Sequence, residues 1–459
     1  MRKWLLLLIP LALFAQVEID TVIYLPSYLC NGFFIPELNK LYVLGWNELY
    51  VLDCSTYELR ARLPRYWELG YGDFSYSWRR QKVYLGVNPK PCSIMVIDAV
   101  ADTLIGWIPK VWSSNEYVSS NDRLYCPQCS PQWSFRVIDC STDSIIKEIP
   151  PPYPAVLFFG PTWDSLYNRL FVGINNFWQG FWGIAVYDCT NDSLLAVVDL
   201  HGHISPARLN FFYKYNKAYY TPCDNVGGYM LPGVIDLNNY SVKFFPFAYQ
   251  GDDCANPVGI DTVDDKVYIP ERWESGVRQC TLFVIDPNTD SIINKVIYRD
   301  YPVEVLVWVP WSNRLYFSNM WFNLWVLDCS TDSIIARLQL SRTGEYAGPC
   351  DIQLDPIRQR IFAIGCDSNA QAVYVLRDVV PGVEEKKVEM SGNLSLPTVV
   401  RNVLKWEPVS GHRSSVLLDV SGRKVLDLLP GVNDVRHLAP GVYFIEIGSS
   451  IERKVVVVK

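Results

Sequence analysis

The residues of this chain that could do chemistry are few and widely spaced. There are four histidines, and two of them, His201 and His203, form a His-x-His pair of the kind that can bind a metal ion. Asp252, Asp253 and Glu304 lie further along the chain in loops that correspond to the His201 loop. No third ligand is evident from the spacing. These residues therefore predict either a metal site or a solvated polar loop.

Thirteen cysteines are the second reactive group, and because this number is odd at least one thiol has no disulfide partner within the chain. The disulfide candidates are Cys126 with Cys129, Cys254 with Cys280, and Cys350 with Cys366. The spacing of Cys126 and Cys129 also fits a redox dithiol or half a zinc site, but no second CxxC pair accompanies it. We therefore expect no cofactor at these cysteines.

Common catalytic and nucleotide-binding motifs are absent from the sequence. It contains no G-x-S-x-G elbow, no P-loop, no CxxCH haem site and no H-E-x-x-H pair. Asp and Glu are plentiful, but nothing selects one pair of carboxylates for glycoside cleavage. The formal net charge of −7 supplies no basic surface, which argues against nucleic acid or anionic lipid as a partner.

Aromatic residues are the more informative group, because the chain has 16 Trp and 28 Tyr. Many of them fall in loops that we expect on one face of the fold. The tryptophans that predict a ligand-binding face are Trp46, Trp67, Trp133, Trp178, Trp182, Trp273 and Trp321. Exposed rings with few reactive neighbours suit stacking on sugars or contact with a protein partner. The alternative is that these rings cover hydrophobic edges inside the fold.

The segments that must position these residues form a sequence repeat. A short apolar strand, an Asp, a polar turn and a second apolar strand occur seven times, as in VIDCSTDSII at 137–146 and VLDCSTDSII at 326–335. The repeated Asp residues are 41 to 50 positions apart, at 53, 98, 139, 188, 236, 286 and 328. A repeat of this length built from strands and turns is typical of a β-propeller. The Asp and the Ser, Thr or Asn residues after it predict a hairpin turn.

A second element, such as RLYCPQ at 123–128 or KVYIPE at 266–271, precedes the Asp line and occurs eight times. The eighth Asp line ends at 372–378 without its second strand, and IDTVIYLP at 19–26 matches the missing strand. The N-terminal segment is therefore expected to supply the outer strand of the last blade and to close the ring. We predict an all-β fold with an eight-bladed β-propeller at residues 16–380, and seven blades plus an irregular unit is the alternative.

The V-I-D-x-x-T-D-S-I-I line with R-L-Y upstream resembles the YVTN-type β-propeller repeat family over residues 17 to about 380. This resemblance implies the fold and no single activity, because such propellers include surface proteins, binding modules and a few enzymes.

A charged linker at residues 381–393 leads to short alternating segments that predict a small C-terminal β-sandwich at residues 394–459. The segments LLDVSGRKVLDL at 417–428, LAPGVYFIEI at 438–447 and RKVVVVK at 453–459 resemble the C-terminal sorting domain of type IX secretion cargo. This resemblance implies outer-membrane secretion machinery as a partner. An ordinary adhesive β-sandwich is the alternative.

The first 15 residues have the pattern of a signal peptide. Arg2 and Lys3 are followed by an apolar run at 4–14, with a cleavage site expected near Ala15. The run is too short to span a bilayer, which needs about 20 residues. We therefore expect no transmembrane segment in the mature protein, and a secreted or cell-surface location after export through the periplasm.

These features favour an exported, non-catalytic binding or scaffold propeller that recognises a polysaccharide or a protein partner through the tryptophan face. The alternative is an enzyme of the lactonase, lyase or glycosidase kind with its site in the central channel, around His201, His203, Asp252 and Asp253. A purely structural surface-layer component is a third interpretation.

Overall fold

The computed structural model divides into two compact units, residues 1–379 and 380–459. In the first unit it describes residues 17–46, 48–64, 72–87, 92–111, 114–128, 134–152, 157–176, 179–201, 208–222, 231–247, 258–271, 280–298, 303–319, 323–340, 349–365 and 371–378. In the second unit it describes residues 398–400, 403–406, 415–419, 424–428, 431–435, 438–439, 441–447 and 450–457. The predicted signal peptide and linker lie outside these residues. Within them, no helix has both the length and the apolar character needed to cross a membrane.

Eight four-stranded antiparallel sheets form the first unit, and we number them as blades in chain order. Blade 1 contains β2 (Leu29–Ile35), β3 (Lys40–Gly45), β4 (Glu48–Asp53) and β5 (Leu59–Pro64). Blade 2 contains β6 (Phe74–Ser77), β7 (Lys82–Val87), β8 (Ser93–Asp98) and β9 (Thr103–Pro109). Blade 3 contains β10 (Glu116–Val118), β11 (Arg123–Pro127), β12 (Phe135–Asp139) and β13 (Ser144–Ile149). Blade 4 contains β14 (Leu157–Asp164), β15 (Arg169–Asn176), β16 (Phe181–Asp188) and β17 (Ser193–Asp199).

The second half of the ring repeats the same order. Blade 5 contains β18 (Asn210–Phe212), β19 (Lys217–Tyr220), β20 (Gly233–Asp236) and β21 (Val242–Phe244). Blade 6 contains β22 (Gly259–Asp261), β23 (Lys266–Pro270), β24 (Cys280–Asp286) and β25 (Ser291–Tyr298). Blade 7 contains β26 (Val303–Val309), β27 (Arg314–Asn319), β28 (Asn323–Asp328) and β29 (Ser333–Gln339). Blade 8 contains β30 (Pro349–Asp355), β31 (Arg360–Gly365), β32 (Gln371–Asp378) and β1 (Val17–Leu25). Single turns of 3-10 helix, η1 (Pro36–Leu38) and η2 (Tyr213–Tyr215), follow β2 and β18.

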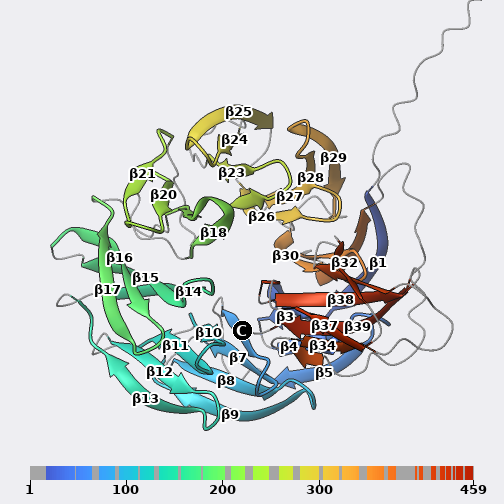
Figure 1. The fold of residues 1–459 in the computed structure, drawn as a ribbon, viewed down its shortest axis with the longest axis horizontal. Helices are drawn as coiled ribbons and strands as arrows, with labels where there is room; N and C mark the ends of the chain where they lie inside the picture. Colours follow the sequence, from blue (N-terminus) through green and yellow to red (C-terminus); the bar gives the residue numbers. More distant parts are fainter. Residues whose placement is uncertain are drawn as a thin grey trace, which may run out of the picture. The chain divides into compact units, whose positions relative to one another are not determined.

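Blade 8 joins the two ends of this unit. β1 pairs antiparallel with β32, from Val17 opposite Asp378 to Leu25 opposite Gln371. Figure 1 shows the blades arranged in a ring around a centre, with the first strand of each blade innermost and β1 at the outer side of blade 8. The predicted eight-bladed all-β propeller is therefore confirmed, and the seven-bladed alternative is wrong.

Each blade packs on the next through its own apolar cluster. Residues of blades 1 and 2 form one cluster, and equivalent clusters join every following pair, including blade 8 with blade 1. Both faces of a blade are therefore buried, which explains why the second and third strands read as nearly continuous runs of apolar residues. The aromatic ring two residues into the second strand, such as Tyr42 or Tyr84, lies fully buried between two blades.

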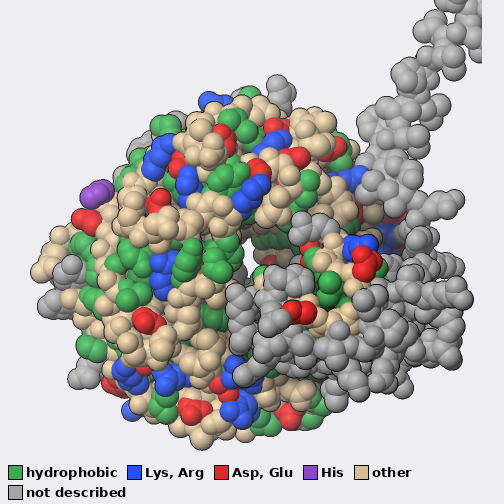
Figure 2. Space-filling view, viewed as in Figure 1, with side chains coloured by type: hydrophobic (Ala, Val, Ile, Leu, Met, Phe, Trp, Pro, Cys, Tyr) green, Lys and Arg blue, Asp and Glu red, His purple; other side chains and the backbone are tan. Residues whose placement is uncertain are grey.

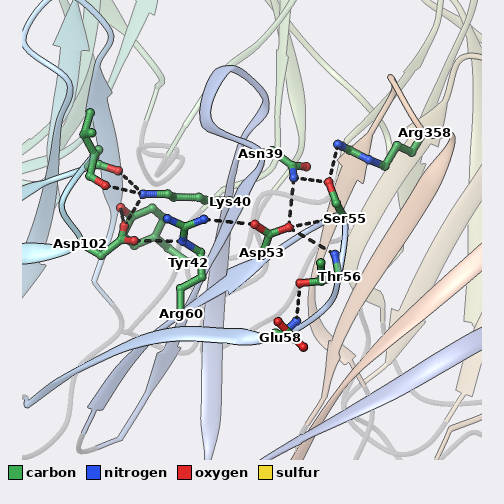
Figure 3. A network of polar contacts seen from close by, with 12 residues as sticks. Asn39, Lys40, Tyr42, Asp53, Ser55, Thr56, Glu58, Arg60, Asp102 and Arg358 are labelled. Atoms are coloured by element: carbon green, nitrogen blue, oxygen red, sulfur yellow. Dashed lines mark hydrogen bonds and ion pairs between the residues drawn. The ribbon is translucent and has the colours of Figure 1, made fainter. Parts of the chain in front are cut away.

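The repeated Asp closes the turn between the third and fourth strands of a blade. Asp53 accepts hydrogen bonds from the backbone N–H groups of Ser55 at 2.8 Å and Thr56 at 3.2 Å (Figure 3). The residue four positions after this Asp has a left-handed backbone, with φ of 61° at Tyr57 and 56° at Asp102 in blade 2. Asp and Asn tolerate this conformation better than most residues, so the D-x-x-x-D pattern is a property of the turn.

The second Asp of this turn ties one blade to the blade before it. The Lys40 ammonium of blade 1 lies 2.7 Å from the Asp102 carboxylate of blade 2 and donates to the Ala99 carbonyl at 2.6 Å (Figure 3). The Tyr42 hydroxyl donates to the same carboxylate at 3.2 Å. Equivalent ion pairs join Lys82 to Asp143, Arg123 to Asp192, Lys217 to Asp290 and Lys266 to Asp332. We call this Lys/Arg–Tyr–Asp set the blade clamp.

Three interfaces depart from this clamp. Between blades 7 and 8, Arg314 pairs with Asp378 at the end of β32. The other two have a Tyr at the Asp position of the turn. Between blades 4 and 5, Arg169 donates to the Tyr240 hydroxyl at 3.0 Å, and Phe171 stands where other blades have Tyr. Between blades 8 and 1, Arg360 precedes Phe362, and Tyr57 occupies the Asp position. When the turn carries a Tyr in place of the Asp, it offers no carboxylate to accept a hydrogen bond from a Tyr of the preceding blade. The second strand of that preceding blade accordingly carries Phe in place of Tyr. These two interfaces lie four blades apart, on opposite sides of the ring.

The second unit contains a five-stranded sheet in the order β33 (Thr398–Val400), β39 (Ser450–Val457), β38 (Gly441–Ile447), β35 (Ser415–Asp419) and β36 (Lys424–Leu428). A two-stranded sheet pairs β34 (Val403–Trp406) with β37 (Gly431–Asp434). Leu404 of the small sheet and Leu417, Ile445 and Val455 of the large sheet belong to one buried cluster. This packing of two sheets confirms the predicted small β-sandwich.

Candidate active site

Of the predicted metal residues, His201 lies within the described part of the chain. His201 follows β17, an outer strand, and its side chain is 71% exposed. Its ring lies edge-on against Phe244 of β21, another outer strand, and its Nδ1 is 3.6 Å from the Asp199 carboxylate. His203 and the acidic pair at 252–253 lie outside the described residues. Over the described part of the chain, no three His, Cys, Asp or Glu side chains are grouped so that they could hold a metal.

The predicted tryptophan face is described at two positions. Trp46 lies between β3 and β4, is 43% exposed, and its ring centroid is 5.1 Å from that of Tyr28. Trp182 lies on β16 opposite Asn175 and is partly buried. The remaining residues of the predicted face, Trp67, Trp133, Trp178, Trp273 and Trp321, lie outside the described residues.

Three of the six disulfide candidates lie within the described residues, and Cys129, Cys254 and Cys366 lie outside them. Cys126, Cys280 and Cys350 are thiols in the structure, whereas Cys92 is the cysteine that carries a disulfide bond among those described. The Cys126 sulfur is fully buried and lies 3.9 Å from the Arg136 carbonyl oxygen, and burial raises the pKa of this thiol. The Cys350 thiol donates to the carbonyl oxygen of Ile364 at 3.3 Å. Strand pairing holds these sulfurs against backbone, which short spacing in the sequence does not reveal.

A charged cluster that the sequence did not reveal lies on the innermost strands. Asp73 directly precedes β6 of blade 2, Glu116 begins β10 of blade 3, and Arg208 lies two residues before β18 of blade 5. The Arg208 guanidinium is 3.1 Å from the Asp73 carboxylate and 3.9 Å from the Glu116 carboxylate. We call these three residues the channel cluster.

Arg208 reaches its partners over the centre of the ring. Two blades separate blade 5 from blade 2 on the shorter way around, and the inner strands of all eight blades face the centre (Figure 1). Figure 2 shows that the ring is hollowed at this centre. The side chains of Asp73, Glu116 and Arg208 are 32%, 22% and 39% exposed. The three side chains are therefore partly exposed to solvent.

The two carboxyl groups of the cluster have different surroundings. Burial raises the pKa of Glu116 to about 7; the charge of Arg208 and a hydrogen bond from the Trp163 backbone oppose this, and the charge of Asp73 adds to it. Asp73 has the closer contact with Arg208 and accepts a hydrogen bond from the Ser114 hydroxyl at 2.8 Å. The charge of Asp73 is also the main reason that the pKa of Arg208 is raised. At neutral pH the site therefore holds Asp73 in contact with Arg208 and a second carboxyl group, Glu116, that gains and loses a proton.

Hydrogen bonds hold the cluster in place from both sides. The Asn115 amide donates to the Asp73 carbonyl at 3.0 Å, which links blade 3 to blade 2. The Asn31 amide of blade 1 donates to the Gly72 carbonyl at 3.2 Å. In blade 8, Asp351 accepts from the Gly32 backbone N–H at 2.9 Å and from the Gln353 amide at 2.8 Å. A polar arc thus runs along the inner strands of blades 8, 1, 2 and 3.

Comparisons with known proteins bear on the fold. No protein-family model matches the chain, and no curated protein matches its sequence. Among solved structures, the dihydro-heme d1 dehydrogenase NirN in complex with DHE is similar, with a TM-score of 0.57, 14% sequence identity, and coverage of 78% of this chain and 80% of that chain. A europium-containing methanol dehydrogenase has a TM-score of 0.55 and 8% identity, and the match covers 76% of this chain and 84% of that chain.

These similarities support the propeller fold and correct the functional interpretation. Both proteins are dehydrogenases, and one of them is described in complex with a ligand. The expectation of a non-catalytic binding or scaffold propeller is therefore wrong, and the alternative of an enzyme with its site in the central channel is the better supported one. His201 lies at the outer strands, whereas the channel cluster lies on the innermost strands.

Proposed function

We propose that the chain is an enzyme that cleaves a C–O bond by general acid–base catalysis in the central channel, in the manner of a glycosidase or lactonase. The observation that carries this proposal is Glu116, a partly buried carboxyl group whose pKa is raised to about 7, near Asp73, with both groups in contact with Arg208. Groups whose pKa lies near the working pH are the most effective general acids and bases. Strongly shifted carboxyls also gather at functional sites.

The two carboxyl groups have complementary roles in this proposal. Protonated Glu116 donates its proton to the leaving oxygen as the C–O bond breaks. Asp73, held in position by Arg208 and Ser114, accepts a proton from the attacking water, whose oxygen forms the new bond to carbon. The proton lost by water replaces the proton given to the leaving group, so the reaction is a hydrolysis. A pair of carboxyl groups with one protonated is the arrangement that glycoside hydrolysis uses.

Arg208 positions both carboxyl groups and does not need to touch the substrate. Its contact with Asp73 holds that carboxyl group in place, and its longer contact with Glu116 leaves that group able to keep its proton. Removal of Arg208 should therefore raise the pKa of Glu116 and move the limb of the pH profile of turnover that depends on Glu116 upward.

The proposal is tested first without a substrate. The ¹³C carboxyl signals of the full chain and of the Glu116→Gln variant are compared from pH 4 to pH 9, and the signal missing in the variant is Glu116. A midpoint near 7 supports the proposal, whereas a midpoint near 4.5 removes its basis. Chromogenic glycosides and lactones are then screened, and any turnover found must fall by at least 10²-fold in Glu116→Gln and in Asp73→Asn.

We further propose that the enzyme is exported and is secreted or held at the cell surface, with the second unit acting as a sorting domain of the type IX kind. The support is the resemblance of segments 417–428, 438–447 and 453–459, and the repeat lines support kinship with YVTN-type propellers. Fusion of residues 394–459 to a periplasmic reporter in a bacterium with this machinery tests the sorting role. A reporter that stays in the periplasm would count against it.

A further inference from the structure

Every blade places an apolar side chain at the same level of its innermost strand. This position lies opposite the residue that follows the repeated Lys or Arg of the second strand, as Trp163 lies opposite Leu170 and Trp308 opposite Leu315. The eight residues at this level, which we call the apolar belt, are Phe34, Tyr76, Tyr117, Trp163, Phe211, Ile260, Trp308 and Leu354. Because the innermost strands face the centre of the ring (Figure 1), the belt encircles the channel.

Most of the apolar belt is incompletely covered by the protein. Phe34 and Tyr117 are buried, whereas the other six side chains are partly exposed. Apolar side chains that stay exposed as a group are typical of binding sites, and concave sites for small molecules are mostly lined by such residues. A ligand that covers these side chains gains the free energy of removing apolar surface from water.

The two indole rings of the belt are fixed in place. The Trp163 indole N–H donates to Asn168 Oδ1 at 3.3 Å, and the Trp308 indole N–H donates to Asn313 Oδ1 at 3.0 Å. Both Asn residues lie in the turn that follows the innermost strand and have a left-handed backbone, with φ of 54° and 52°. Since the one polar group of each indole is already bonded, the rings offer apolar faces in a fixed orientation. Such preorganised rings lower the entropic cost of binding an aromatic group.

The belt lies closer to Glu116 than to Asp73. Glu116 directly precedes the belt residue Tyr117, and its carboxyl group accepts a hydrogen bond from the backbone of the belt residue Trp163. Asp73 lies three residues before the belt residue of its own blade, Tyr76. A strand rises about 3.3 Å per residue, so the level of the belt is roughly 3 Å from the Glu116 backbone and roughly 10 Å from the Asp73 backbone. The proposed acid is therefore beside the apolar belt, and the proposed base is further away.

We propose that the apolar belt receives the leaving group of the substrate, and that this group is aromatic, as in an aryl glycoside. This inference rests on the proposed function, because it names the substrate class of the same site. In the proposed hydrolysis the C–O bond breaks as Glu116 protonates the leaving oxygen, so the group attached to that oxygen lies on the side of Glu116. The attacking water loses its proton to Asp73 on the other side, away from the belt.

The test uses 2-naphthol, which is the leaving group of a naphthyl glycoside and has no bond that the enzyme could cleave. It is titrated into the full chain labelled with ¹³C at the methyl groups of Ile and Leu. We expect ring-current shifts in the methyl signals of Ile260 and Leu354, which the conservative variants Ile260→Val and Leu354→Ile identify. Phenol, which lacks the second ring, should bind about tenfold more weakly, because it buries less apolar surface.

Trp308→Ala should weaken the binding of 2-naphthol about tenfold, because it removes one apolar face of the belt. The matched control is Trp107→Ala, which removes an exposed indole from the outer strand β9 and should leave the affinity unchanged. If Trp308→Ala does not fold, the methyl shifts of the unchanged chain still decide the question.

Three results would overturn the inference: no shift of Ile260 and Leu354 at high 2-naphthol, equal affinities for phenol and 2-naphthol, or a loss of affinity in Trp107→Ala and none in Trp308→Ala. The titration of Glu116 is measured without 2-naphthol. Failure of this inference is therefore distinguishable from failure of the proposed function.

Discussion

The raised pKa of Glu116 leads to a prediction for the stability of the propeller. Because the pKa of Glu116 is about 7 in the folded protein and its ordinary value is 4.5, the folded chain keeps a proton that the unfolded chain has released between these pH values. The free energy of unfolding contributed by this residue is therefore constant below pH 4.5 and falls as pH rises to 7. Each pH unit of the difference corresponds to 1.36 kcal/mol, so the full loss is about 3 kcal/mol.

Glu116→Gln removes this loss, because the amide is a neutral group of the same shape. At pH 8 the variant should be more stable than the unchanged protein by up to about 3 kcal/mol, and at pH 4.5 the two should be nearly equal. For a propeller of this size, 3 kcal/mol corresponds to a rise in Tm of about 4 °C. Asp73→Asn is the matched control. It should lower Tm at pH 8, since it leaves Arg208 beside a site that has lost its closer carboxylate.

The assay is calorimetry of the full chain at pH 4.5, 6 and 8, in which the transition of the propeller is followed separately from that of the second unit. The reasoning is refuted if Glu116→Gln shifts Tm by the same amount at all three pH values, or if it destabilises the propeller at pH 8. Either result would mean that the carboxylate form of Glu116 is not disfavoured in the channel, and the proposed acid role would lose its physical basis.

The blade clamps give further predictions. Asp332→Ala leaves the partly buried ammonium of Lys266 in the preceding blade without its counterion and should cost up to about 3 kcal/mol, measured as a fall in Tm. An unchanged Tm would contradict a role for the clamp. Asp143→Tyr alone should be similarly harmful, whereas its combination with Lys82→Arg and Tyr84→Phe copies the clamp between blades 4 and 5 and should recover at least half of the loss. A triple variant no more stable than the single one would show that the clamp type is not transferable. The thiols that follow the repeated Asp are buried and their pKa is raised, so a thiol reagent should modify them only after unfolding; rapid labelling of the native protein would contradict the burial of Cys54, Cys140, Cys189 and Cys329.

The sequence by itself determined the ring and its closure signals. The repeated Asp and the Lys/Arg of the second strand recur because each makes local contacts that every blade needs, the turn and the clamp. Such residues recur at similar intervals along the chain, so the blades can be counted from the sequence alone. The small C-terminal β-sandwich was predictable in the same way, from alternating segments between turn residues.

Only the tertiary structure decided where chemistry can occur. Asp73, Glu116 and Arg208 come from three blades and occupy different places relative to the repeat lines, so no spacing in the chain connects them. Their meeting depends on the ring, which brings the first strand of every blade to one axis. The same geometry placed His201 at an outer strand, although its His-x-His spacing made it the more conspicuous candidate. Arg208 contacts residues of blades 2 and 3 because the closed ring brings their innermost strands together. Nothing in the sequence indicates this contact.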